Sequence, residues 1–413
     1  MNNYFYKTSI FFILYLSLIV GFFLDENSSG GALPDFKVRH DLIENFRDNF
    51  IFTFLNYDQF GDRHSPSLVI FLALLGKIGL EIDILRLIHL NLLPILILVS
   101  YKSFKIKFSN IDENKIFFLC LVFFISPSLR SIAIWPDSRL LGLIFFVISI
   151  YFFLKFQKEK EFKFCILNNF FLIISSYISP NFSIFFLYFF YYFLKSYKLS
   201  LKIFLMLSMN ILLSLPMLFY VFFLKINFLF IPAISNIDLF NRLNPSNKIL
   251  ILFSLLLFYM IPFLLDKNFS KNIFKNFRMN YLVYSFLIFI TLVIFFNYSI
   301  EYTGGGIFFK ISYYLFNNNY FFLLISFLSI ILTLHAFKLN SNNAILFLIL
   351  IISNPQLSIY HKYYDPLLIL LFFLLINFKF DINSFFNKKL IINFYSFYVG
   401  LLGINLISRY VLT

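Results

Sequence analysis

Apolar runs long enough, or nearly long enough, to cross a lipid bilayer recur along the whole chain. A transmembrane α-helix needs about 20 consecutive apolar residues, and polar, lysine-rich segments separate such runs here. The thirteen runs are 5–24, 84–101, 116–133, 139–154, 164–179, 181–194, 203–224, 249–265, 281–297, 321–336, 344–354, 366–378 and 390–408. This pattern predicts an all-α polytopic membrane bundle of about 13 transmembrane helices.

The composition agrees with this class. Of the 413 residues, 60% are hydrophobic and only 13% are charged, whereas soluble domains are about 45–50% apolar and about 25% charged. Cys120 and Cys165 both lie in apolar runs and offer neither a disulfide framework nor metal-ligand spacing. The run 5–24 has no cleavage pattern of small residues, so we expect it to be a retained first span. Residues 1–413 are therefore interpreted as a single integral membrane domain.

The distribution of charge predicts the orientation. With a cytoplasmic N-terminus, the cytoplasmic segments are 1–4 with Lys7, 102–115, 155–163, 195–202, 266–280, 337–343 and 379–389. These segments hold 20 Lys and Arg and 6 Asp and Glu, and the rest of the chain holds 14 of each class, so one face carries the whole net charge of +14. This is the positive-inside pattern. The basic balance therefore indicates membrane orientation and gives no reason to expect a nucleic-acid partner. We expect the protein in a bacterial inner (plasma) membrane.

The orientation requires that the run 67–80 does not cross. This run has about fourteen residues and contains Gly76, Lys77 and Gly79, so we expect a re-entrant or interfacial helix. If it crossed, every later lysine-rich loop would change side. The first outer loop then extends over residues 25–83.

The part of this loop from Asp25 to Pro66 is the longest polar interval of the chain. It contains eight acidic residues and two of the five histidines, namely Asp25, Glu26, Asp35, Asp41, Glu44, Asp48, Asp58, Asp62, His40 and His64. Apolar residues recur at helical spacing over 38–55, which predicts an amphipathic helix lying on the membrane surface. We interpret the loop as the carrier of a catalytic carboxylate.

Three further polar motifs fall on the outer side. Residues 126–139 hold the only tryptophan, an aspartate and two arginines; residues 297–310 contain a triple glycine; residues 354–366 crowd histidine, lysine, tyrosine and aspartate together. Structural interpretations remain open beside the functional one. Asp137 or Ser138 could cap the helix that follows, the acids 41, 44 and 48 could form a solvated helix face, and Arg86 with His89 could be a polar pair within the bundle.

These residues carry a resemblance. An aspartate follows the first span in a long outer loop, then His64-x-Pro66, a short apolar helix ending near Gly76–Gly79, Arg86 in the next span, and Asp137 in a second outer loop. This resembles the GT-C type glycosyltransferases that use polyprenol-linked sugars, such as protein O-mannosyltransferases and the lipid A aminoarabinose transferase. The resemblance covers about the first 200 residues, which places the transferase module at about 1–224 and leaves 249–408 as later spans. Relatives often have Asp–Glu in the first loop, whereas Phe36 follows Asp35 here.

The resemblance implies an inverting sugar transfer at the outer face of the membrane. The donor is a polyprenyl-phosphate sugar, and the acceptor is a lipid, a glycan or a protein. Asp35, or alternatively Asp41, would act as the base, and Asp137 would orient a substrate. The implied substrate-binding residues are His64, Arg86, Arg130, Arg139, His361, Lys362 and Tyr364. No cofactor is expected, and a divalent cation held by Asp35 and Asp137 stays possible.

Other functions are weighed against this one. A polysaccharide polymerase or ligase uses the same lipid carriers on the same face, but such proteins normally have their largest loop late in the chain, and here it comes first. A transporter requires ionisable groups within the spans and repeated halves, and neither is visible. If the chain were a non-catalytic subunit, the acidic and basic residues on the outer side would be unexplained.

Cysteine labelling tests the predicted orientation. A membrane-impermeant maleimide applied from outside should react with a Phe60→Cys variant and not with a Lys160→Cys variant, because only this arrangement keeps the lysine excess inside. Permeabilised cells serve as the control in which both positions react. The opposite accessibility would reverse the orientation and move the acidic loop to the cytoplasm.

Overall fold

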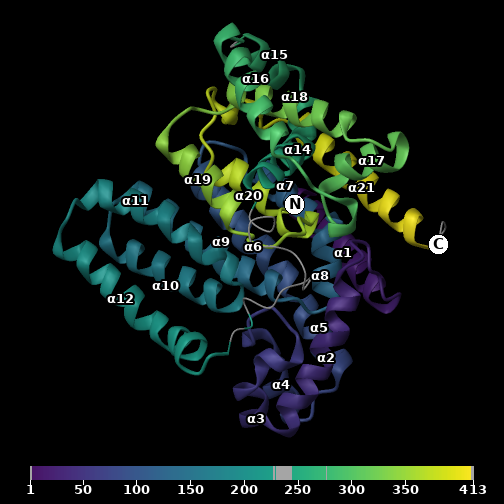
Figure 1. The fold of residues 1–413 in the computed structure, drawn as a ribbon, viewed down its shortest axis with the longest axis vertical. Coiled ribbons are helices and arrows are strands. Elements are labelled where there is room, and N and C mark those ends of the chain that lie inside the picture. Colours follow the sequence, from purple (N-terminus) through teal and green to yellow (C-terminus); the bar gives the residue numbers. More distant parts are fainter. Residues whose placement is uncertain (1, 227, 229–243, 276, 411–413) are drawn as a thin grey trace. The chain divides into compact units, whose positions relative to one another are not determined.

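The computed structural model describes residues 2–226, 228, 244–275 and 277–410. In that part of the chain the regular secondary structure is helical, and β-type pairing is limited to two isolated bridges (Figure 1). Contacts divide the chain into two compact units, the first consisting of Met1–Ala233 with Leu401–Thr413 and the second of Ile234–Gly400. The prediction of one membrane domain over 1–413 stays a prediction.

The N-terminal part of the first unit begins with a long apolar helix and ends with a π-helical turn. Its elements are α1 (Asn2–Phe23), α2 (Ala32–Asp48), α3 (Phe50–Leu55), η1 (Tyr57–Phe60), α4 (Ser67–Lys77), α5 (Ile82–Leu90), α6 (Leu92–Lys107), α7 (Glu113–Leu121), η2 (Val122–Ile125), α8 (Pro127–Ile134), α9 (Ser138–Glu159), α10 (Phe162–Ile178), η3 (Pro180–Phe185), α11 (Phe186–Tyr197), α12 (Leu201–Leu218) and η4 (Phe219–Phe223).

Six of the described helices are long and apolar enough to cross a bilayer, and the number rises to eight if each of two bent pairs is one span. The six are Phe5–Phe23, Ile82–Lys107, Ser138–Glu159, Leu201–Phe223, Pro245–Leu264 and Lys388–Tyr410. Five further apolar helices have 10–17 residues. The chain is thus an all-helical integral membrane protein, whereas the count of about thirteen spans stays a prediction.

Buried amides join the membrane-type helices of the first unit. α9 packs against both α6 and α10, and α12 runs beside α10 (Figure 1). Asn168 on α10 donates to the backbone carbonyl and the hydroxyl of Ser149 on α9, and Asn169 donates to the carbonyl of Met206 on α12. Such interhelical hydrogen bonds are typical of helices that pack where water is scarce.

The run 116–133 is bent in the middle, and its crossing of the bilayer stays a prediction. Residues 113–125 and 127–134 meet at an angle of 63°. Ser126 has extended backbone angles at the break, and its hydroxyl accepts the N–H of Leu129 to cap α8. A proline disfavours the helical conformation of the residue before it, so Pro127 starts a new helix. All eight residues of α8 are buried.

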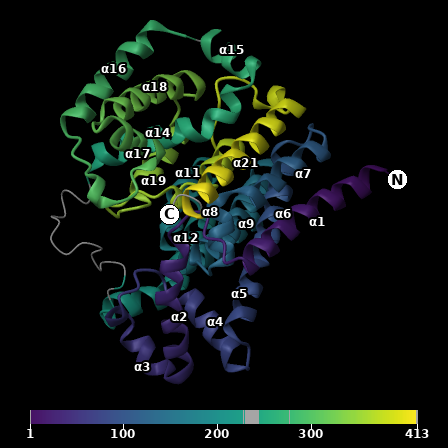
Figure 2. The ribbon, with the colours of Figure 1, turned by 90° about the vertical axis from the view of Figure 1, so that its right-hand side faces the viewer.

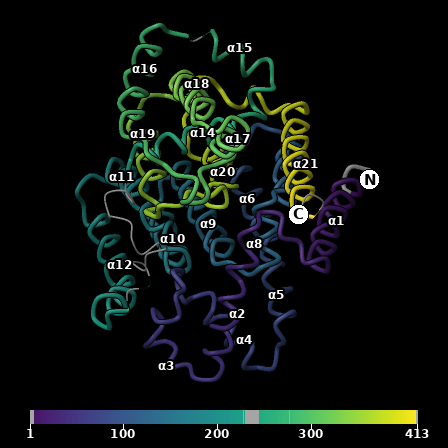
Figure 3. The backbone as a smooth tube through the Cα atoms, turned by 45° about the vertical axis from the view of Figure 1, so that its right-hand side comes forward, coloured from purple at the N-terminus to yellow at the C-terminus, as the bar shows by residue number. Residues whose placement is uncertain are grey.

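The polar loop after α1 folds into α2, α3 and α4 (Figure 3). The amphipathic helix expected over 38–55 begins instead at Ala32 and breaks at Asn49, whose side chain caps α3. The apolar face of α2 is buried against α4 and is not left to lipid, because α4 offers it a matching apolar surface. The residues of this core include Leu42, Ile43, Phe46, Tyr57, Leu68, Val69, Leu72 and Ala73.

The helix α4 has the length that its predicted role requires. Its 11 residues correspond to about 16 Å at about 1.5 Å per residue, half of the roughly 30 Å hydrocarbon core. It ends at Lys77 and is followed by Gly79 with φ +93°. A non-crossing interfacial or re-entrant helix over 67–80 is consistent with this length.

In the second unit, several helices pack around α14 (Figure 2). The elements are α14 (Pro245–Leu264), α15 (Lys267–Lys275), α16 (Met279–Ile294), η6 (Ile300–Tyr302), α17 (Gly306–Phe316), α18 (Tyr320–Ala336), α19 (Ser341–Ile352), η7 (His361–Tyr363), α20 (Leu367–Leu374), η8 (Ile382–Phe385) and α21 (Lys388–Tyr410), whose residues from Leu401 onward belong to the first unit. The helix α17 was not predicted from the sequence.

Two of the sequence motifs meet within this second unit. The N–H of Gly305 donates to the carbonyl of Ile359 at 2.9 Å. Gly304 has φ +71°, and a Cβ atom there would lie 2.5 Å from that same carbonyl oxygen. Only glycine suits such a left-handed position with a backbone so close. The triple glycine therefore joins the segment 297–310 to the segment 354–366.

Candidate functional site

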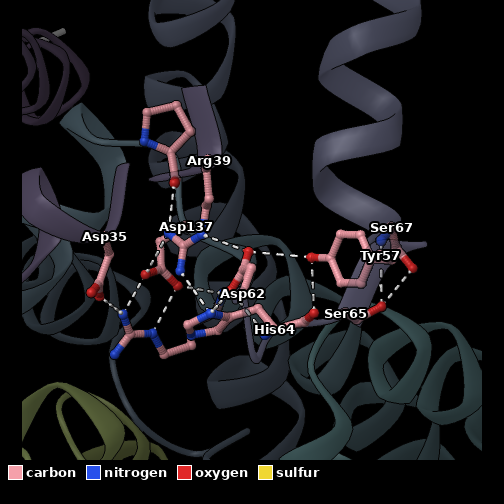
Figure 4. Close-up of polar contacts among 10 residues, drawn as sticks. Asp35, Arg39, Tyr57, Asp62, His64, Ser65, Ser67 and Asp137 are labelled. Carbon is pink, nitrogen blue, oxygen red and sulfur yellow. Dashed lines mark hydrogen bonds and ion pairs between the residues drawn. The ribbon is translucent and has the colours of Figure 1, made fainter. Parts of the chain in front are cut away.

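Asp137 lies at the centre of a buried polar cluster in the first unit (Figure 4). It is the N-cap of α9, and its carboxylate accepts the backbone N–H of Arg139 at 2.9 Å. This satisfies one of the donors that the start of a helix leaves without a partner. The side chain is 0% exposed, so its charge has to be neutralised by neighbouring groups.

Arg139 is the first of two guanidinium groups that contact Asp137. Its Nε donates to Oδ1 at 2.7 Å and its Nη2 donates to Oδ2, which makes a bidentate pair. The same Nη2 lies 3.6 Å from Oδ2 of Asp35 on α2. The side chain of Asp35 is 33% exposed, whereas that of Arg139 is 9% exposed. Asp35 is therefore a solvent-accessible carboxylate at the edge of the cluster.

Arg39 is the second guanidinium that contacts Asp137, and it was not among the predicted site residues. It follows Asp35 by one helical turn and is 2% exposed. Its Nη1 donates to Asp137 at 3.1 Å and to the carbonyl of Pro136 at 2.9 Å. Its Nε lies 3.9 Å from Asp62. Arg39 thus ties α2 to the start of α9 and to the loop before α4 (Figure 4).

The third part of the cluster is a pair formed by Asp62 and His64. Nδ1 of His64 lies 2.7 Å from Asp62 Oδ1 and 3.2 Å from Nη2 of Arg39. A guanidinium cannot accept a hydrogen bond, so we assign the Nδ1 proton to the shorter contact with Asp62. Asp62 also accepts from the His64 backbone N–H and from the Tyr57 hydroxyl.

This pair has a form that suits proton transfer. The side chain of Asp62 is 6% exposed and that of His64 is 28% exposed, so a buried carboxylate orients an imidazole that solvent reaches. Among the described residues, Nε2 of His64 has no hydrogen bond to another side chain. A carboxylate that fixes the tautomer of a reachable histidine is a common arrangement for a general base.

The charges of the cluster stabilise one another. Burial acts to raise the pKa of Asp137, but Arg139 and Arg39 outweigh it and hold this pKa well below its usual range. Burial also opposes ionisation of Asp62, and His64 with Arg39 nevertheless lowers its pKa to about 2. Burial would lower the pKa of Arg39, but Asp137, Asp62 and Asp35 raise it. The two buried carboxylates and Arg39 are therefore ionised at neutral pH.

An apolar cavity lies next to this cluster. The hydroxyls of Ser65 and Ser67, which follow His64, both donate to the backbone carbonyl of Tyr177 on α10. Tyr177 lines a cavity of about 350 Å³. Its other lining residues come from α10, η3, α11 and α12, and they are Asn169, Leu172, Ile173, Ser176, Pro180, Ser183, Phe186, Asn210, Ser214, Met217 and Leu218.

Arg130, a predicted substrate-binding residue, has its guanidinium donors occupied by acceptors of the protein itself. Its Nε and Nη2 hold Glu26 at 2.8 and 2.5 Å, and its remaining donors reach Ser17 Oγ, the Ser17 carbonyl and the Phe124 carbonyl. A guanidinium has five N–H donors, and these contacts use all of them. Arg130 thus fastens the end of α1 to α8, and we leave it out of the proposed site.

Arg86 has a similar anchoring geometry. Its two terminal nitrogens contact Asp25 at 2.8 Å and Asp83 at 3.0 Å. The guanidinium carbon lies 3.9 Å from the centre of the Trp135 ring, which is a close cation–π contact. The indole N–H of Trp135 in turn donates to the carbonyl of Glu26. Arg86 therefore holds the beginning of the polar loop.

The remaining predicted residues belong to the second unit. Nε2 of His361 accepts the N–H of Ile307 at 2.8 Å, and Nδ1 lies 3.3 Å from the Tyr259 hydroxyl. Because Nε2 accepts, the ring is neutral in this geometry, and burial lowers the pKa of His361 to about 4. Tyr364 is buried, and the ammonium of Lys362 lies over the Tyr360 ring. The roles assigned to these residues stay predictions.

The described residues contain no group of three or more His, Cys, Asp and Glu side chains suited to hold a metal ion. Asp35 and Asp137, the two carboxylates considered for a divalent cation, both contact the Arg139 guanidinium. That guanidinium occupies the position a shared cation would need. We therefore include no metal in the proposed site.

The stability of the cluster should depend on pH through Asp62. Because its folded pKa of about 2 lies below the ordinary 3.8, its charge stabilises the fold above pH 4, and this contribution, on the order of 2 kcal/mol, is lost as the pH falls toward 2. Melting temperatures in detergent should show wild type above Asp62→Asn at pH 7, with the gap narrowing below pH 4. Asp41→Asn, an exposed change on α2, should follow wild type throughout. If the difference in melting temperature between wild type and Asp62→Asn did not change with pH, the charge of Asp62 would not be the source of the stabilisation.

Comparison of the chain with protein-family models, with curated proteins and with solved structures gives no match.

Proposed function

We propose that this chain is a membrane glycosyltransferase of the GT-C type, which moves a hexose or pentose from a polyprenyl-phosphate donor to an acceptor hydroxyl. The observation that carries the proposal is the accessible carboxylate of Asp35, 3.6 Å from the guanidinium of Arg139. A base beside a cation is what attack on a sugar next to a phosphate leaving group requires. The acceptor is a lipid, a glycan or a protein.

In the proposed reaction Asp35 takes the proton of the acceptor hydroxyl while the hydroxyl oxygen bonds to the anomeric carbon of the sugar. The bond between that carbon and the phosphate oxygen breaks, and its electron pair leaves with the lipid phosphate. The configuration at the carbon is inverted. Asp35 suits this role better than Asp137, because Asp137 is fully buried and both of its oxygens are held by arginines.

Arg139 supplies the charge that the leaving group needs. The phosphate gains a negative charge as the sugar leaves, and a cation already fixed in place stabilises that charge without reorganising. Asp137 fixes Arg139 through its bidentate contact, and Arg39 braces Asp137 from the other side. In this proposal Asp137 and Arg39 are positioning residues.

We assign the adjacent cavity to binding of the lipid part of the donor. An isoprenoid chain lies in the bilayer, so its binding surface has to be apolar and formed by membrane helices. The cavity beside Tyr177 has these properties, and Ser65 and Ser67 connect it to the segment that holds His64. The predicted topology places this end of the helices at the outer face of a bacterial inner membrane.

Substitution of Asp35 tests the catalytic role. Asp35→Asn keeps the shape and hydrogen bonding of the side chain but removes the basic oxygen, so transfer should fall by roughly 10²–10⁴-fold while the melting temperature changes little. The assay is transfer from a polyprenyl-phosphate sugar by purified protein in liposomes, with Asp41→Asn as the matched control. Full activity in both variants would exclude the first loop from catalysis and favour a polymerase, ligase or transporter. Loss in His64→Gln alone would move the base to His64.

Substitution of Arg139 tests the phosphate contact. Arg139→Lys keeps the charge but loses the planar fork, so the KM for the donor should rise by about 10-fold or more, with a smaller change in kcat. Arg130→Lys is the control, because it alters a guanidinium filled by Glu26 and Ser17 and should lower the melting temperature without a selective change in KM. An unchanged KM in Arg139→Lys would contradict phosphate binding at this residue.

A further inference from the structure

A strongly basic surface lies at one end of the second unit. Three segments form it, 266–280, 335–343 and 377–389, and they carry eight cations, namely Lys267, Lys271, Lys275, Arg278, Lys338, Lys379, Lys388 and Lys389. All but Lys379 are exposed. The same segments contain only two acids, Asp266 and Asp381. We call this set of cations the basic surface.

Backbone and amide contacts bring the three segments together. The N–H of Lys379 donates to the carbonyl of Ala336, and the N–H of Lys338 donates to the carbonyl of Asn377. The amide of Asn387 donates to Asp266 at 3.0 Å. The other oxygen of Asp266 accepts backbone N–H groups at the start of α15. The cations therefore share one surface because the fold gathers them, although they are far apart in sequence.

The helix α15 within this surface is amphipathic and firmly attached. Phe269 and Ile273 point inward and are 0% and 2% exposed. The ring of Phe269 contacts rings from α14 and from the segment 377–389, namely Phe263, Phe378, Phe380 and Phe385. Lys267, Lys271 and Lys275 follow at intervals of four, so they share the opposite face. Phe274 is 67% exposed beside them.

The direction of α15 fits a membrane surface. α15 and the apolar helix α16 meet at an angle of 93°. α16 exposes a broad set of large apolar side chains, including Val283, Phe286, Leu287 and Ile294. If α16 crosses the bilayer, α15 lies in the plane of the interface, where lysines reach headgroups and an exposed phenylalanine enters the acyl boundary.

We propose that the basic surface is a docking site for anionic phospholipids, with α15 as its interfacial helix. Charge complementarity selects this occupant, because the three segments carry eight cations and only two acids and because the surface borders the apolar helix α16. The cations are spread over three segments and do not converge on one buried point, as a site for a single soluble phosphate would require. The proposed site is independent of the sugar transfer proposed for the first unit.

Lipid titration of the full-length protein in neutral detergent tests this proposal. Phosphatidylglycerol should raise the melting temperature in a saturable way, and phosphatidylcholine should not. The triple variant Lys267→Gln, Lys271→Gln, Lys275→Gln should lose on the order of 100-fold in apparent affinity for phosphatidylglycerol. The corresponding triple Arg variant should keep it, since the charge is retained.

A matched control removes three exposed lysines from helix ends of the first unit: Lys158→Gln, Lys195→Gln, Lys202→Gln. It should keep the affinity for phosphatidylglycerol within about twofold, the change expected when no contacting charge is removed. An equal loss in the control would overturn the site, as would equal stabilisation by inorganic phosphate or by phosphatidylcholine. If the triple Gln variant melts at a lower temperature than wild type even without lipid, the single variant Lys271→Gln is used instead. Its apparent affinity for phosphatidylglycerol should then fall by about fivefold.

Discussion

A carboxylate with no exposed surface at the start of a membrane-type helix has to be neutralised where it lies, and Asp137 is neutralised by Arg39 and Arg139. An ion buried without its partner costs several kcal/mol, so neither arginine is dispensable. Arg139 comes with α9 itself, but Arg39 belongs to α2, separated from Asp137 by 98 positions in sequence. The polar loop after α1 is therefore obliged to fold back onto the start of α9. Asp35, one helical turn before Arg39, is brought to Arg139 by the same requirement.

Two further arginines fix the beginning of that loop. Arg130 holds Glu26 and the end of α1, and Arg86 holds Asp25 while stacking on Trp135. The loop is thus anchored before α2 by two contacts and within α2 by Arg39. A cluster fixed from both sides is preorganised, which is the condition under which a charged site in low dielectric can stabilise a developing charge. The free-energy cost of burying these three guanidinium groups is offset by their hydrogen bonds to carboxylate and carbonyl oxygens.

The sequence predicted the positions of the long helices better than the points at which helices break. Apolar runs predicted α9, α12, α14 and α21 to within a few residues, because helices that contact lipid on one face have to be apolar over their whole length. The break at Pro127 was missed, since hydropathy does not register a proline within an apolar run. The early part of α2 makes tertiary contacts that a periodic pattern cannot reveal, such as that of the Phe36 ring with the Trp135 ring. Arg39 and Asp62 were missed because their partners lie far along the chain; the only local signals were the spacing of four between Asp35 and Arg39 and the Asp62-x-His64 spacing.

The arginines of the first unit differ in how many of their N–H donors have acceptors within the protein. This difference distinguishes arginines that hold the fold together from those that are candidates for substrate binding. Arg130 has acceptors for all five of its N–H groups, so a phosphate would have to displace a buried carboxylate to reach it. Arg139 instead shares one nitrogen between buried Asp137 and accessible Asp35, the latter at the long distance of 3.6 Å. In the proposed reaction, an incoming donor phosphate competes with Asp35 for that nitrogen. Donor binding would then release the carboxylate from its ion pair just when the acceptor hydroxyl needs a base. Binding of the donor and activation of the base would be coupled through one guanidinium held in place by Asp137.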